Sequence, residues 1–490
     1  MTNVSRNAGA VIGQIVITSL LMFVLYREML EIIGLESIGI WSVVLAAASA
    51  SRLTDLGLSA SVTRFVALHR SGGRQQEASE AIQTVFVSTS LILSVLLIAS
   101  YPLLSYVFRF FLSDVDLLKA RALLPFSLLS LYIASAAGVF LAAIDGCQRQ
   151  DIRVIIVVLG QVIYVLTGLW LMRSFQLIGL AWAQIFQGLS LLVASWILLR
   201  RQQAELPLVP FVWKKKSFLE MLSYGLQFQL GSIVMMLFDP LTKAMLARYG
   251  GVGAVGYFEM ASQLVTRVRA LIVSANQVVV PLIASVYQHD VRHLEKIFNF
   301  SMELLFLVIG PIFALLILWS PLISELWLGT RDEKFTAYVT ILSIAWGFNV
   351  IAGPAYFANQ GTGKIGWNSA SHVWIGVANV LLGWSLGKIF GAWGVLSAMA
   401  IALVSGSLVI LLSYCTNIKD RKHWRLSWQA LLVMLVSITI VMLSEDLYLF
   451  SQPFDGAIQL LILIFLPSLV LGLCLWMHPF RKLILSNIFP

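Results

Sequence analysis

Apolar stretches of about 20 residues, long enough to cross the hydrocarbon layer of a bilayer as helices, follow one another along nearly all of this 490-residue chain. Only 12% of the residues are charged, against about 25% in an average soluble protein. The sequence therefore predicts an all-α polytopic membrane protein with about fourteen transmembrane helices. The predicted spans are 8–33, 38–66, 82–108, 121–144, 153–172, 177–199, 218–247, 253–285, 298–320, 336–359, 368–387, 391–415, 427–444 and 456–477.

Basic residues in the short loops predict the orientation of these spans, because Lys and Arg stay on the cytoplasmic side. With the N-terminus inside, 19 basic residues fall in inner loops and 8 in outer loops. Both termini are therefore expected in the cytoplasm, and the acidic loop "SEDLYLFSQPFDG" on the outer side. The need for basic inner loops explains most of the positive net charge. Attraction of these loops to anionic lipid is a further reason for it. Nothing calls for a nucleic-acid partner.

Glycines in nearly constant register indicate an internal repeat. "GLESIGIW" from Gly34 matches "GVGAVGYF" from Gly251. We expect two six-helix lobes, residues 1–210 and 211–420, followed by a helix pair in 421–490. Each lobe begins in the cytoplasm, so a pseudo-twofold axis along the membrane normal would relate them around a central cavity. Three further glycines of the first lobe have counterparts in the second at one shared offset: Gly146 with Gly361, Gly168 with Gly383, and Gly179 with Gly394.

Ionisable residues inside a membrane helix are costly and mark a partner, a hydrated cavity or a ligand. The six basic residues that the loops leave over are confined to spans one, two, seven and eight, and they follow the repeat. Arg269 matches Arg52 at an offset of 217, and Lys243 matches Arg27 at an offset of 216, so these cations are expected to form pseudo-symmetric pairs. Counted along the helices, Arg52 and Arg267 lie near mid-depth. Arg27 and Lys243 lie nearer the outer side.

Helical spacing places several of these residues on shared faces. Arg52 and Asp55 lie on one face of span two, and Glu259 and Arg267 on one face of span eight. Asp239 and Lys243 form an i,i+4 pair beside Pro240, which is expected to bend its helix. Two interpretations remain open: a hydrated cationic cavity, or packed ion pairs that hold the lobes together.

The sequence resembles a known superfamily in three places. These are "LYREMLEIIGLESIGIWSVVLAAASASRLTDLGLSASVTRFVA", "SYGLQFQLGSIVMMLFDPLTKAMLARYGGVGAVGYFEMASQLV" and "YFANQGTGKIGWNSASHVWIGVANVLLGWSLGKIFGAWGV". They are similar to bacterial polysaccharide flippases of the multidrug/oligosaccharidyl-lipid/polysaccharide exporter superfamily, over residues 8 to 415. The resemblance implies movement of an undecaprenyl diphosphate-linked oligosaccharide from the inner to the outer leaflet of the bacterial inner membrane by alternating access.

The same resemblance implies that Arg27, Arg52 and Arg269 match basic residues that such flippases place in their first, second and eighth helices. We expect five residues to form the cationic substrate site: Arg27, Arg52, Arg267, Arg269 and Lys243. Four carboxylates are candidates for coupling transport to H⁺ or Na⁺, or for lining the cavity: Asp239, Asp55, Glu28 and Glu259. A polysaccharide polymerase and glycosyltransferases are candidate partners.

Other functions stay open. A peptidoglycan-precursor flippase would carry similar cations. A cation-coupled multidrug exporter should instead have an acidic cavity, and a scaffold for a polymerase would not transport at all. The three cysteines are scattered without a CxxC pair. We predict no enzyme activity, no cofactor and no metal.

Overall fold

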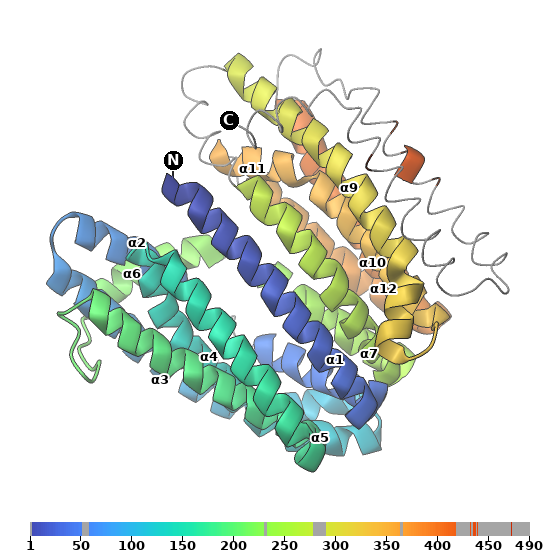
Figure 1. The fold of residues 1–490 in the computed structure, drawn as a ribbon, viewed down its shortest axis with the longest axis horizontal. Coiled ribbons are helices and arrows are strands. Elements are labelled where there is room, and N and C mark those ends of the chain that lie inside the picture. The colour runs from blue at the N-terminus through green and yellow to red at the C-terminus, as the bar shows by residue number, and fades with distance from the viewer. Residues whose placement is uncertain are drawn as a thin grey trace. The chain divides into compact units, whose positions relative to one another are not determined.

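The computed structural model describes residues 2–50, 58–229, 233–277, 291–362 and 366–417, with a few single positions beyond. The two predicted C-terminal spans, and the site candidates Arg52 and Asp55, lie outside these residues. Every regular element in the described ranges is helical (Figure 1). The α-helices are α1 Thr2–Ala50, α2 Leu58–Ser71, α3 Gln75–Val107, α4 Asp114–Gly146, α5 Gln150–Gln202, α6 Lys215–Gln229, α7 Ile233–Gln277, α9 Val291–Leu328, α10 Glu333–Ile351, α11 Gly353–Gly361 and α12 Gly366–Asn417.

Four of the long helices are each broken at one residue. The breaks are Gly34 (φ 78°, ψ 166°) in α1 and Gly251 (φ 76°, ψ 171°) in α7. Gln176 (φ 50°, ψ −127°) breaks α5, and Gly391 (φ 60°, ψ −137°) breaks α12. The members of each pair occupy corresponding positions of the two halves and have nearly the same dihedral angles. The repeat that the glycines predicted is therefore confirmed in the backbone.

At these breaks the chain folds back on itself. A Cβ atom on Gly179 would lie 2.5 Å from the carbonyl oxygen of Leu171, on the other side of the break in α5. In a straight helix these residues would be about 12 Å apart. Gly394 approaches the carbonyl oxygen of Leu386 in the same way in α12. Helices α5 and α12 are therefore hairpins of two predicted spans each, and the breaks in α1 and α7 give those helices the same form.

Length and composition support membrane crossing. Seven helices in the described part of the chain are long and apolar enough to span a bilayer, and the one at Gln150–Gln202 has 53 residues. A straight helix of that length would be about 80 Å long, against a hydrocarbon layer of about 30 Å. The chain is thus an all-α, multi-pass membrane protein. The total of fourteen spans stays a prediction.

The described helices group into two compact units, Met1–Met260 with Asn379–Val395, and Ala261–Ala378 with Leu396–Pro490. A core of the first unit packs Leu58 and Val62 of α2 against Ile82 of α3 and Phe140 of α4. The Phe140 ring lies 4.8 Å from that of Phe86 and 4.7 Å from that of Trp196. The predicted boundaries near residues 210 and 420 remain predictions.

Candidate functional site

The hairpins of α1 and α7 touch at two glycines. A Cβ on Gly39 would overlap the carbonyl oxygen of Val252, and a Cβ on Gly256 would overlap that of Leu35. Gly39 and Gly256 are counterparts in the repeat, and so are Leu35 and Val252, both at the offset of the two helix breaks. The two contacts are therefore images of each other, and the pseudo-twofold axis passes between α1 and α7 at this point.

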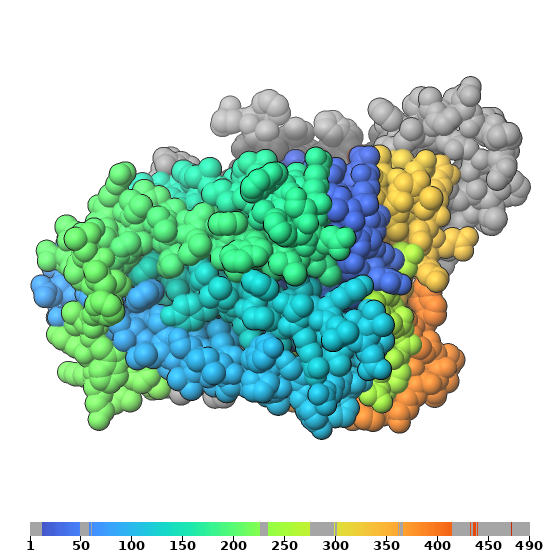
Figure 2. Space-filling view, turned by 90° about the horizontal axis from the view of Figure 1, so that it is seen from below, coloured from blue at the N-terminus to red at the C-terminus, as the bar shows by residue number. Residues whose placement is uncertain are grey.

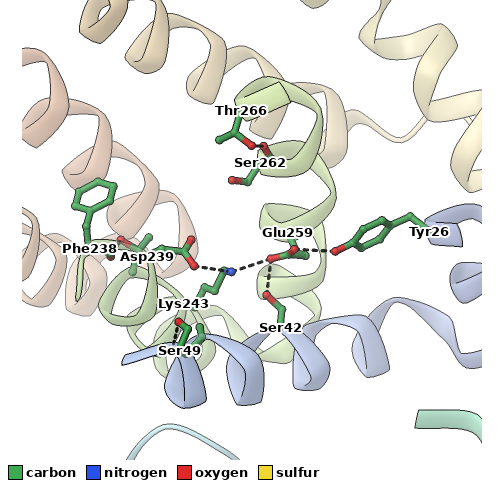
Figure 3. Close-up of polar contacts among 11 residues, drawn as sticks. Tyr26, Ser42, Ser49, Phe238, Asp239, Lys243, Glu259, Ser262 and Thr266 are labelled. Carbon is green, nitrogen blue, oxygen red and sulfur yellow. Dashed lines mark hydrogen bonds and ion pairs between the residues drawn. The ribbon is translucent and has the colours of Figure 1, made fainter. Parts of the chain in front are cut away.

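A cluster of charged side chains on α7 also contacts α1 (Figure 3). Lys243 places its Nζ 2.7 Å from Oδ2 of Asp239 and 2.8 Å from Oε2 of Glu259. The pair of Asp239 and Lys243 expected from their spacing is confirmed. Lys243 and Glu259 are 8% and 7% exposed, whereas 46% of the Asp239 side chain is exposed.

Two hydroxyl groups of α1 also bind Glu259. Tyr26 donates its hydroxyl to Oε1 at 2.8 Å, and Ser42 donates to Oε2 at 2.6 Å. Tyr26 and Ser42 would lie about 24 Å apart in a straight helix, so the break at Gly34 brings them to one carboxylate. Burying a carboxylate is tolerable only with such partners.

The cluster follows the repeat but is chemically asymmetric. Tyr26 is the counterpart of Lys243 in the repeat, and Ser42 is the counterpart of Glu259. The first repeat thus supplies hydroxyls where the second supplies charges.

This register corrects the predicted match of Arg27 with Lys243. At the offset of the two helix breaks, the counterpart of Arg27 is Ala244. The Arg27 side chain is 53% exposed and pairs with Glu31 at 3.7 Å. It therefore does not occupy a position equivalent to that of Lys243.

The charges of the cluster do not balance when both carboxylates are ionised. Lys243 supplies one positive charge, and Asp239 and Glu259 supply two negative charges. A single proton or monovalent cation would neutralise the group. Pro240 lies inside α7, whose non-helical dihedral angles are at Gly251; the bend expected at Pro240 stays a prediction.

A second set of polar groups surrounds Arg269 in the other unit. Its Nη2 donates to Oδ1 of Asn349 on α10 at 3.2 Å, and its guanidinium lies 4.4 Å from the Trp346 ring. Asn349 in turn donates from Nδ2 to the Ser407 hydroxyl of α12 at 3.2 Å. The Nε of Arg269 is buried without a hydrogen-bond acceptor, and none of the described carboxylates pairs with this side chain.

The remaining candidates lie on the same helices. Arg267 is half-buried on α7 in the second unit, and Glu28 is half-buried on α1 in the first. The structure brings together Asp239, Lys243 and Glu259. Whether the cations share one cavity stays a prediction.

Sequence reasoning missed five residues of the two clusters. They carry no charge and do not stand out in an apolar helix: Tyr26, Ser42, Asn349, Ser407 and Trp346. When the two repeats are aligned so that Gly34 matches Gly251, Tyr26 and Ser42 are the counterparts of Lys243 and Glu259.

The fold and the polar clusters define a multi-pass helical membrane protein built from two repeats whose first hairpins meet at a pseudo-twofold axis. The chain belongs to the polysaccharide biosynthesis protein family, whose model matches residues 4–287. This confirms the predicted resemblance. A protein of Shigella flexneri described as "Putative O-antigen transporter" is 23% identical over 345 residues, which are 68% of this chain and 78% of that protein.

Solved structures show the same fold. The lipid II flippase MurJ in an inward closed conformation matches with a TM-score of 0.75 at 16% identity, over 98% of this chain and 99% of that one. A multidrug resistance MATE family transporter of the MOP superfamily, in an inward-facing conformation, matches with a TM-score of 0.71 at 14% identity, over 83% and 98%. At these identities the likeness is one of fold.

Proposed function

We propose that the protein is a flippase that moves an undecaprenyl diphosphate-linked oligosaccharide from the inner to the outer leaflet of the bacterial inner membrane by alternating access. The family, and the similar Shigella flexneri protein described as "Putative O-antigen transporter", support a polysaccharide role. The flippase of similar fold, named for lipid II, supports a lipid-linked substrate. In this proposal both termini are cytoplasmic, and a polymerase and glycosyltransferases work on the same substrate.

The observation that supports an anionic substrate best is the environment of Arg269. Arg269 is partly buried, and removing a guanidinium from water is costly unless an anion or several good acceptors compensate its charge. Asn349 and Trp346 are neutral, and the described residues offer no carboxylate. A diphosphate supplies about two negative charges and oxygens that fit the guanidinium fork.

The other candidate cations differ in the partners that they bind. Arg27, Arg52 and Arg267 are proposed to contact the diphosphate along its path. Lys243 already binds two carboxylates, so it would engage the diphosphate only after releasing one of them.

Replacing Arg269 by alanine is expected to lower glycan export at least about tenfold, since a charge-assisted hydrogen bond contributes about 1.5–3 kcal/mol. Arg269→Lys should restore only a fraction of the rate because a point charge cannot bind two oxygens at once. Export is measured in cells whose own flippase gene is deleted, with the variant quantified in the membrane. Arg331→Ala, an exposed arginine paired with Glu325, is the matched control.

Wild-type export by Arg269→Ala at normal protein levels would reject the substrate role of Arg269. The same strains separate the alternative functions. Rescue of cells depleted of their peptidoglycan-precursor flippase, without rescue of glycan export, would favour that substrate. A change in drug susceptibility alone would favour a multidrug exporter.

The cluster of Asp239, Lys243 and Glu259 is proposed to couple flipping to an ion gradient. When Lys243 engages the diphosphate, one carboxylate loses its partner and can take up H⁺ or Na⁺ from outside. Release of substrate would then favour the return of the empty protein.

Asp239→Asn and Glu259→Gln are each expected to make the flipping rate in proteoliposomes less dependent on an imposed proton or Na⁺ gradient. Glu333→Gln, an exposed carboxylate of α10, controls for the loss of a charge. If both variants keep the gradient dependence of the wild type, the cluster is not the coupling site, and Glu28 or Asp55 is examined next.

A further inference from the structure

A buried polar stripe on α3 holds the segment that joins α5 to α6. Ser79, Gln83, Thr84 and Ser88 are at most 5% exposed, although α3 is an apolar helix. Their helical spacing, with Gln83 and Thr84 adjacent and the outer two a turn away on either side, places them on one face of the helix. This stripe contacts residues 203–214, which we term the linker.

Six polar contacts bind the linker to α3, one of them to Gln75, the first residue of that helix. The Ser79 hydroxyl donates to the carbonyl oxygen of Glu205 at 3.0 Å, and the Trp213 ring nitrogen donates to the Ser88 hydroxyl at 2.9 Å. The backbone amides of Val212 and Lys214 donate to Gln83 and Thr84, each at 3.2 Å. The Gln203 side chain donates to the carbonyl oxygen of Gln75 at 2.7 Å, and Lys214 pairs with Glu80 at 2.6 Å.

These contacts use main-chain groups and polar tips, and they leave apolar side chains facing outward. Phe211 is 78% exposed, Leu208 73%, Val209 54% and Trp213 48%. The linker, in green, lies on the surface at the left of Figure 2. Several exposed apolar side chains on one short segment indicate a partner.

The position of the linker along α3 indicates that this partner is the surface of the membrane. The helix begins with exposed polar residues around Glu77, and its exposed apolar surface starts at Leu91, one turn beyond Ser88. Trp213 therefore lies where the water-facing part of α3 gives way to the part that faces hydrocarbon. Tryptophan is enriched at this boundary in membrane proteins.

Basic side chains surround the apolar ones. Lys214, Lys215 and Lys216 follow Trp213 directly, and Arg201 precedes the linker; all four are exposed. Aromatic and aliphatic side chains next to lysines are typical of segments that lie in the interface of an anionic membrane, because the apolar parts enter the acyl boundary and the ammonium groups reach the phosphates.

We propose that the linker is an interfacial anchor for anionic phospholipid. Leu208, Phe211 and Trp213 enter the headgroup layer, and Lys215 and Lys216 bind lipid phosphate. The polar stripe of α3 fixes the backbone so that these side chains face the membrane. The proposal does not depend on the transported substrate.

Native mass spectrometry of the purified full-length protein tests the lipid contact, with phosphatidylglycerol competing against phosphatidylcholine. Lys215→Gln/Lys216→Gln is expected to lower the preference for phosphatidylglycerol about fivefold per lysine at low ionic strength. Lys119→Gln/Lys334→Gln removes the same charge from exposed positions elsewhere and should keep the preference. Equal loss in both double variants, or none in either, would overturn the proposal.

A second measurement reports where the linker lies. Phe211→Cys, with the three native cysteines replaced by serine, is labelled with an environment-sensitive fluorophore and reconstituted in phosphatidylglycerol vesicles. Quenching by lipids with a nitroxide near the headgroup, and protection from iodide, are expected. Iodide quenching in vesicles rejects the anchor. If the label is then protected in native membranes, a protein partner covers the segment instead.

Discussion

Replacing Gly39 by alanine is expected to destabilise the folded protein strongly and to lower its level in the membrane. The added Cβ would overlap the carbonyl oxygen of Val252, and the backbone nitrogen of Gly256 would lie 3.1 Å away. Both neighbours are backbone, so no side chain can turn aside. Overpacking at a rigid contact costs about 1–3 kcal/mol or more, and Gly256→Ala should cost a similar amount by symmetry.

Thermal unfolding of the detergent-purified protein, together with its level in the membrane, checks this prediction. Gly138→Ala and Gly253→Ala are the matched controls, because a Cβ at either position meets nothing within 4 Å. In a helix they should be neutral or stabilising by up to about 1 kcal/mol. Normal accumulation and stability of Gly39→Ala would mean that α1 and α7 do not meet at these glycines.

The second large effect is expected from Lys243→Met. This change leaves Glu259 buried, accepting from Tyr26 and Ser42 but without the Lys243 ammonium, and the loss of one partner of a buried ion pair costs about 3–5 kcal/mol. Glu259→Gln alone should be mild. Lys243 keeps Asp239, and the amide oxygen of glutamine still accepts from a hydroxyl.

The double variant Lys243→Met/Glu259→Gln decides whether the two charges compensate each other. If they do, it should recover most of the stability that Lys243→Met loses, so the two changes are strongly non-additive. The same unfolding assay measures all three variants, with Lys334→Met as a control for an exposed lysine. Additive effects would show that Glu259 does not depend on Lys243.

The sequence predicted the helical class and the repeat because both rest on strong local signals. Apolar length limits what can cross a bilayer, and glycines are needed at positive φ and at close backbone contacts, as at Gly34 and Gly39. The pair of Asp239 and Lys243 was predictable from helical spacing alone. The break at Gln176 could not be predicted from its residue type, because glutamine rarely adopts a positive φ such as the 50° found here. Only its counterpart in α12, the glycine Gly391, indicates a break at this position.

The partners of Glu259 could not be predicted with the same means. Lys243 and Glu259 are several helical turns apart along the chain, and only the fold-back at Gly251 brings them together. Tyr26 and Ser42 come from the other repeat and differ in type from their counterparts. The polar stripe of α3 gives no comparable signal in the sequence because single serine and threonine residues are common in membrane helices.

The contact between Ser42 and Glu259 shows what a chain with two fused repeats allows that a symmetric dimer does not. Residues on a twofold axis face their own images, so in a dimer of identical half-length chains that carried the glutamate of the second repeat, two glutamates would confront each other there. Joining two copies of an ancestral half in one gene frees each copy to change alone. A serine can then face a glutamate, and a charged cluster becomes possible at the one place where exact symmetry would set like charges against each other.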